Sequence, residues 1–95
     1  MYVPSGKQPA SGPFARAVSA EIRAAMARHR VSALLLSTRS GLSRSYLGKR
    51  LRDEVAFTFN DVEAICEAMR EDLPGLMQSA FKRMHNHKKE APHSD

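Results

Sequence analysis

Apolar residues recur at steps of three and four along most of the chain, and this spacing is typical of helices that bury one face. The first apolar stripe predicts a helix over residues 14–28 and comprises Phe14, Val18, Ile22, Ala25 and Met26. The last stripe comprises Leu73, Leu76, Met77, Ala80, Phe81 and Met84. Its helix should begin near Asp72 and Pro74, because proline suits the first turn of a helix.

Two short helices are predicted directly after the first stripe. Ser32 is a good N-cap for a helix over residues 33–39. Gly41 is the natural place for the left-handed backbone conformation that ends this helix. Ser43 then caps a helix over residues 44–52. The sequence therefore predicts a helix pair joined by a tight turn.

A fourth helix is predicted between this pair and the last stripe. Thr58 opens it, and Asp61 three residues further on completes an approximate capping box. The inner face of this helix comprises Val62, Ile65, Cys66 and Met69. Residues with β-branched side chains are few, and alternating apolar runs are short. The pattern as a whole predicts an all-α fold of five short helices on one core.

The composition changes at both ends of the chain. Residues 1–13 hold three of the five prolines and two of the five glycines, which predicts a flexible N-terminal arm. Residues 85–95 are polar and contain Pro92, which predicts a flexible C-terminal tail. The remaining residues, 14–84, are enough for one small helical domain.

Several classes of protein are disfavoured. Cys66 is the only cysteine, which excludes an internal disulfide, and no Cys/His group has zinc-finger spacing, so we expect neither metal nor cofactor. No catalytic constellation is visible, so we do not expect an enzyme. The chain has no run of ~18–20 apolar residues and no signal-peptide core at its start. We therefore expect a cytoplasmic protein with no membrane and no small-molecule partner.

The formal net charge of +5 is unevenly distributed. Residues 14–52 contain eight arginines and one lysine but a single acid, Glu21. Residues 53–78 contain seven acids but a single base, Arg70. A basic half beside an acidic half attracts polyanions to one face of a small domain. Because arginine suits the geometric recognition of phosphates and guanines, this pattern indicates nucleic acid as the partner.

The stretch 33–51 combines features that two closely crossing helices need. Leu36 and Leu47 are placed to anchor one helix each in the core. Ser37 is small enough for the helices to cross closely, and Gly41 permits the tight turn between them. This combination resembles the helix-turn-helix of lambda-repressor and Cro-like proteins, the XRE family.

The resemblance covers about residues 18–77 and implies a compact five-helix lambda-repressor-like DNA-binding domain. Four positions depart from the family pattern. Ser37 stands where the family usually has alanine, and Ala33 and Arg44 stand where glutamine is frequent near the start of the two helices. Arg50 stands where an apolar residue is common, which suggests that the end of the second helix of the motif rotates or tightens.

The resemblance implies that the helix opening after Ser43 reads bases in the major groove of DNA. Base contacts are implied for Arg44, Ser45, Tyr46 and Lys49. Phosphate contacts are implied for Ser32, Arg39, Ser43, Arg50 and Arg52. We therefore expect a sequence-specific regulator that binds double-stranded operator DNA. It is most like a phage or prophage immunity repressor or a Cro-like protein that acts by occupying its operator.

Two other functions remain open at this point. An antitoxin of a toxin–antitoxin pair shares this fold, binds its own promoter, and uses an extra apolar surface for its toxin. A non-DNA interaction module would keep the fold without the base-reading residues. The positions Ala80, Phe81 and Met84 extend the last stripe beyond the expected core. Either they form a homodimer contact through the C-terminal helix, or they fold back on the first helix.

Overall fold

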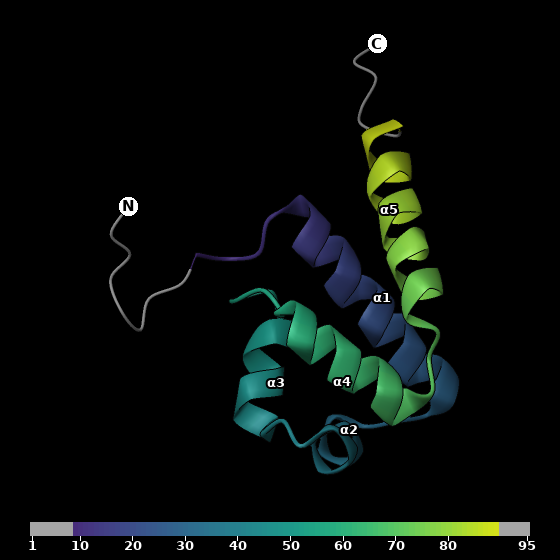
Figure 1. Cartoon of the computed structure of the whole chain (residues 1–95). Coiled ribbons are helices and arrows are strands. Elements are labelled where there is room, and N and C mark those ends of the chain that lie inside the picture. The colour runs from purple at the N-terminus through teal and green to yellow at the C-terminus, as the bar shows by residue number, and fades with distance from the viewer. Residues whose placement is uncertain (1–8, 90–95) are drawn as a thin grey trace.

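The computed structural model describes residues 9–89, and five helices make up most of that range. They are α1 (Pro13–His29), α2 (Ala33–Ser40), α3 (Arg44–Leu51), α4 (Phe59–Met69) and α5 (Leu73–Lys89) (Figure 1). The all-α prediction with five helices is confirmed. Among the described helices, none combines the length and the apolar character that crossing a bilayer requires.

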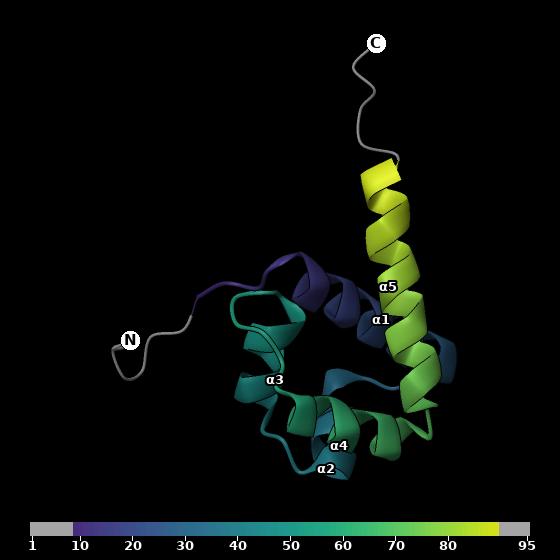
Figure 2. The ribbon, with the colours of Figure 1, turned by 45° about the horizontal axis from the view of Figure 1, so that its top comes forward.

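The five helices form two groups that share one core. The long helices α1 and α5 pack side by side, and the shorter α3 and α4 also pack against α1, with α2 beside them (Figures 1 and 2). Helix α2 contacts both α3 and α4, while α1 contacts α3, α4 and α5. The C-terminal part of α5 projects beyond the other four helices in both views. The helix pair α2–α3 therefore lies at the opposite end of the molecule.

Every helix contributes at least one side chain with no exposed surface to the core. These side chains include Ile22, Leu36, Leu47, Ile65 and Ala80, one from each helix in chain order. Burying an aliphatic side chain of the larger kind contributes about 1.5–3 kcal/mol relative to exposure, so these positions are the main anchors. Cys66 is also buried in this core, and desolvation raises the pKa of its thiol to about 11.

The helix ends follow the capping signals of the sequence. The hydroxyls of Ser32, Ser43 and Thr58 each accept a hydrogen bond from a backbone N–H of the following first turn, at 3.0–3.1 Å. The capping box of α4 is complete, because Asp61 also accepts from the Thr58 N–H at 2.9 Å. Gly41 ends α2 with φ +82°, a conformation that glycine adopts without steric cost.

The described structure extends into both of the segments that the composition assigned to tails. Ser11 is buried, and its N–H donates to the Asp53 carbonyl at 3.3 Å, so the described end of the predicted arm is attached to the domain. Helix α5 continues to Lys89, which corrects the expected start of the C-terminal tail at residue 85. Helical periodicity at this end is carried by polar residues, which give no apolar signal. Residues 1–8 and 90–95 lie outside the described residues.

Candidate nucleic-acid interface

The turn between α2 and α3 is tight and is closed by two hydrogen bonds. The Gly41 N–H donates to the Ser37 carbonyl at 3.0 Å and closes the end of α2. The Ser37 hydroxyl donates to the Leu42 carbonyl at 2.6 Å and ties α2 to the segment that enters α3. Leu36 and Leu47 are both fully buried on either side of this turn. A small hydroxyl at position 37 thus both permits the close crossing and fixes it.

The outward side of α3 presents three polar side chains, Arg44, Ser45 and Lys49. All three are exposed, and within residues 9–89 none of them forms a side-chain hydrogen bond or an ion pair. Ser45 and Lys49 lie four residues apart and therefore share one face of the helix. Two positive charges and a hydroxyl are available there to a partner from outside the domain.

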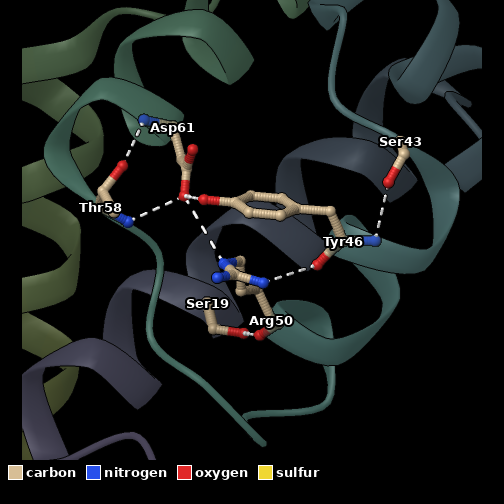
Figure 3. A network of polar contacts seen from close by, with 6 residues as sticks. All are labelled: Ser19, Ser43, Tyr46, Arg50, Thr58 and Asp61. Carbon is tan, nitrogen blue, oxygen red and sulfur yellow. Dashed lines mark hydrogen bonds and ion pairs between the residues drawn. The ribbon is translucent and has the colours of Figure 1, made fainter. Parts of the chain in front are cut away.

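Tyr46 lies on the side of α3 that faces α4, not on the outward side. Its hydroxyl donates a hydrogen bond to Asp61 Oδ2 at 2.8 Å, and the residue is half-buried (Figure 3). Burial raises the pKa of Tyr46, and the hydrogen bond to Asp61 raises it further. The expected outward position of Tyr46 is therefore corrected, since its hydroxyl already has a partner inside the domain.

Arg50 is buried, with 8% of its surface exposed, which corrects the outward position that the implied phosphate contact requires. Its guanidinium carbon lies 3.4 Å from the centroid of the Tyr46 ring. Nη1 donates to the Tyr46 carbonyl at 3.2 Å, and Nε lies 3.7 Å from Asp61 Oδ2 (Figure 3). The Arg50 side chain therefore points toward α4, inside the domain. Only a small part of the guanidinium side chain is exposed to a phosphate outside the domain.

A buried polar network surrounds Arg50 and links three helices. Asp61 of α4 accepts hydrogen bonds from the Tyr46 hydroxyl and the Thr58 N–H, and it pairs with Arg50. Ser19 of α1 is buried, and its hydroxyl donates to the Arg50 carbonyl at 3.3 Å (Figure 3). The sequence interpretation missed Ser19 entirely and gave Asp61 only a capping role. The one signal in the sequence for this network was Arg50, a charged residue at a position that faces the core.

The residues predicted to contact phosphates differ in availability. The Ser32 and Ser43 hydroxyls are exposed, and each accepts one capping hydrogen bond, so each retains a proton to donate. Arg39 is exposed at the end of α2. Arg52 is exposed too, but its Nε donates to Glu54 Oε2 at 2.7 Å. Such an exposed pair is weak, so a phosphate can compete for Arg52.

Ion pairs inside the domain neutralise part of the basic half of the chain. Four of its eight arginines face a carboxylate, in the pairs Arg23–Asp53, Arg28–Glu71, Arg50–Asp61 and Arg52–Glu54. In the described part of the chain, the cations without a carboxylate partner include Arg39, Arg44 and Lys49 on α2 and α3. The helix pair thus carries three uncompensated cations and no acid, while other cations without a carboxylate partner, Arg16, Arg30, Arg70 and Lys82, lie elsewhere in the domain.

A surface hollow of about 560 Å³ lies where α1, α2 and α4 end, and His29, Arg39 and Arg70 are among its lining residues. Helix C-termini carry partial negative charge, so basic side chains there stabilise the helix ends. Arg70 ends α4 in a left-handed conformation, as Arg30 ends α1. These cations therefore have a structural explanation. In the range 9–89, no group of three metal-ligating side chains is placed to hold an ion.

Part of the C-terminal stripe folds back on α1. The Phe14 and Phe81 rings are stacked, with centroids 4.8 Å apart and planes 23° apart. Ala80 is fully buried, so its predicted dimer contact is wrong. Met84 is partly buried against the core. Phe81 nevertheless keeps 55% of its surface exposed, and it remains available to a partner.

No family model matches this chain, and comparisons with curated proteins and with solved structures also find no match. Its function is therefore inferred from the geometry of α2 and α3. The inferred interface combines the uncompensated cations Arg39, Arg44 and Lys49 with the exposed capping hydroxyls Ser32 and Ser43. These groups are donors of hydrogen bonds and suit an anionic partner.

Proposed function

We propose that this chain is a sequence-specific transcriptional regulator that binds double-stranded operator DNA. It belongs, in this proposal, to the lambda-repressor and Cro-like class, with α2 and α3 as the helix-turn-helix. The observation that carries the proposal is the outward side of α3, where Arg44, Ser45 and Lys49 are exposed without an internal partner. The opposite side of the same helix is anchored by Leu47.

The chemistry of these side chains supports base reading. A major groove admits one helix, and arginine or lysine donates to the O6 and N7 acceptors of guanine. Guanines are therefore expected opposite Arg44 and Lys49, with each good bidentate contact worth about 1–3 kcal/mol of discrimination. Ser32, Ser43, Arg39 and Arg52 set the register through phosphates. Regulation then follows from occupancy, because a bound operator is closed to polymerase or to a competing regulator.

Self-association is proposed through a surface formed by the four phenylalanines of the chain, called here the phenylalanine surface: Phe14, Phe57, Phe59 and Phe81. Phe14, Phe57 and Phe59 line a common shallow depression, and Phe81 stacks on Phe14. Phe59 is 78% exposed and Phe81 is 55% exposed. A soluble domain gains free energy by covering so much apolar surface. A second copy bound there makes the regulator a two-fold dimer.

The same surface favours a second candidate function, that of an antitoxin. There the phenylalanine surface binds a toxin, and the helix pair binds the promoter of the operon. Co-expression with the product of the neighbouring gene distinguishes the two functions. A stable 1:1 complex that Phe59→Ser disrupts supports the antitoxin, whereas self-association disrupted by the same change supports the regulator.

Selection of bound sequences from a random duplex pool at fixed salt tests the proposed function. The expected result is a consensus with guanines, and a palindrome with half-sites about one helical turn apart indicates a dimer. The affinity for the consensus is then compared with that for a scrambled duplex at the same ionic strength. Lys82→Ala, on the exposed side of α5, is the matched control and should not change this ratio. Enrichment of no sequence contradicts the proposal.

A further inference from the structure

We propose that Arg50 and Asp61 are a positioning pair that sets the rotation of α3 about its own axis. The rotation of α3 determines where Arg44, Ser45 and Lys49 point. The claim that this pair fixes the rotation of α3 can be tested on the domain without DNA. Its consequence for base reading rests on the proposed DNA-binding function, and the experiment below separates the two.

Apolar packing alone holds α3 only loosely in rotation. The helix has eight residues, and Leu47 is its only fully buried apolar side chain, with Leu51 partly buried. Burial of apolar surface is favourable in any orientation, because the hydrophobic effect has no direction. A two-turn helix resting on so few apolar contacts needs directional contacts to hold one rotation.

The contacts between α3 and α4 supply that direction. The planar Arg50 guanidinium lies against the Tyr46 ring, donates to the Tyr46 carbonyl and faces Asp61 (Figure 3). The Tyr46 hydroxyl reaches the same Asp61 oxygen at 2.8 Å. Asp61 cannot follow a turning α3, because the Thr58 N–H and its own N–H hold it in the capping box of α4. The hydrogen bond and the ring contact of Arg50 are both made to Tyr46 within α3, so α3 and α4 are joined by the directional Tyr46–Asp61 hydrogen bond and by the Arg50–Asp61 ion pair.

Side chains of α1 hold the C-terminal end of α3 through hydrogen bonds to its carbonyls. Ser19 donates to the Arg50 carbonyl, and Arg23 Nη1 donates to the Leu51 carbonyl at 2.8 Å. The same Arg23 nitrogen also donates to the Ser19 hydroxyl at 2.8 Å. The last carbonyls of α3 are thus held by α1 while its Tyr46 and Arg50 side chains are held by α4. Rotation of α3 would therefore change contacts with both helices.

Stability does not explain why a charge occupies this position. Burying two charges carries a desolvation cost that the attraction between them barely offsets, and apolar replacements are often neutral or stabilising. Arg50 Nε is buried and has no hydrogen-bond partner, so the pair is not optimised for stability. What the pair provides, and an apolar side chain does not, is a defined orientation of the helix that carries the exposed donors.

The test compares the chain with Arg50→Met, which keeps an unbranched side chain of similar length. Affinity for the selected duplex and for a scrambled duplex is measured over a range of salt, and amide hydrogen exchange is followed in both proteins without DNA. The expected result is a loss of discrimination of roughly tenfold or more with an unchanged salt slope. Faster exchange of the α3 amides relative to those of α1 is expected in the same variant.

Two results would overturn the positioning role. One is unchanged discrimination together with unchanged exchange of the α3 amides. The other is a salt slope smaller by about one, which identifies Arg50 as a direct phosphate contact. If Arg50→Met does not fold, Tyr46→Phe is measured instead, since it removes one hydroxyl and keeps the ring. Tyr46→Phe should speed amide exchange in α3 and reduce discrimination between the selected and the scrambled duplex. If it changes neither, the positioning role is refuted.

The amide measurement also keeps the two proposals apart. If the unaltered chain shows no sequence preference, the DNA-binding proposal fails, whereas hydrogen exchange in Arg50→Met still decides whether the pair fixes α3. Lys49→Met is the matched control for the exposed side of the same helix. It should reduce discrimination through a lost base contact and leave exchange of the α3 amides unchanged.

Discussion

The Tyr46 hydroxyl donates a hydrogen bond to Asp61 Oδ2 across 2.8 Å and joins the predicted recognition helix to the first turn of α4. Arg50 faces the same carboxylate and stacks on the same ring. Asp61 therefore serves two helices at once, since it caps its own helix and compensates a buried charge on another. Replacing Asp61 should therefore lower the stability of the domain through the loss of both roles.

Asp61→Ala is expected to destabilise the domain by about 3–5 kcal/mol, because it leaves the Arg50 charge buried without a partner. Urea unfolding measures this loss. In an Arg50→Met background the same substitution should cost clearly less, since no unpaired charge remains, and only the lost cap and hydrogen bonds contribute. Equal losses in the two backgrounds would show that Asp61 and Arg50 do not stabilise each other.

Arg44→Ala should change which sequences the protein prefers. The side chain is exposed on the outward side of α3, and loss of an arginine–guanine contact costs about 1–3 kcal/mol at one base pair. The measurement is a set of affinities for operator variants that differ at single positions. The preference should relax at one position of each half-site. An unchanged ranking of the variants would exclude Arg44 from base reading.

Arg52→Ala should weaken binding to all duplexes alike. Arg52 lies at the end of α3 and pairs only with the exposed Glu54, so it is available to a phosphate. The salt slope of binding should fall by about one. Glu54→Gln removes the competing carboxylate and should strengthen binding to every sequence. A change in sequence ranking after Arg52→Ala would contradict the phosphate assignment.

Gly41→Ala is expected to destabilise the domain by about 1–2 kcal/mol through backbone strain alone. Gly41 has φ +82°, and a Cβ placed there meets no atom within 4 Å, so no steric clash with a neighbour contributes. Asparagine tolerates the left-handed conformation better, and Gly41→Asn should cost less than Gly41→Ala. Thermal unfolding of both variants measures the difference. Equal losses would show that the φ angle is not the cause.

Cys66 should make the domain less stable at alkaline pH. Burial raises the pKa of its thiol from 9.0 to about 11, with Glu71 and Asp72 adding to the shift. The folded state therefore keeps a proton that the unfolded state loses, and stability falls as pH rises from about 9 to about 11. Cys66→Ala should show a smaller decline over this range. The difference between the two urea-unfolding profiles isolates the thiol, and parallel profiles would exclude it.

The sequence by itself determined the local structure of this protein. Apolar spacing predicts the helices, because a side chain every three or four residues points to the same side regardless of context. Ser32, Ser43 and Thr58 cap helices through bonds within one turn, and Gly41 allows its turn through its own backbone. The order of the helices follows from such local rules, whereas the length of α5 does not, because its last residues up to Lys89 give no apolar signal.

Only the tertiary structure decided which polar side chains face inward. A count of charges shows eight arginines in residues 14–52 but cannot show that Arg50 meets Asp61, because the two belong to helices whose packing brings them together. The sequence likewise cannot show the hydrogen bond from Ser19 to the Arg50 carbonyl or the stacking of Phe81 on Phe14. Desolvation and ion pairing depend on neighbours that are distant along the chain, so they appear only when the helices have packed.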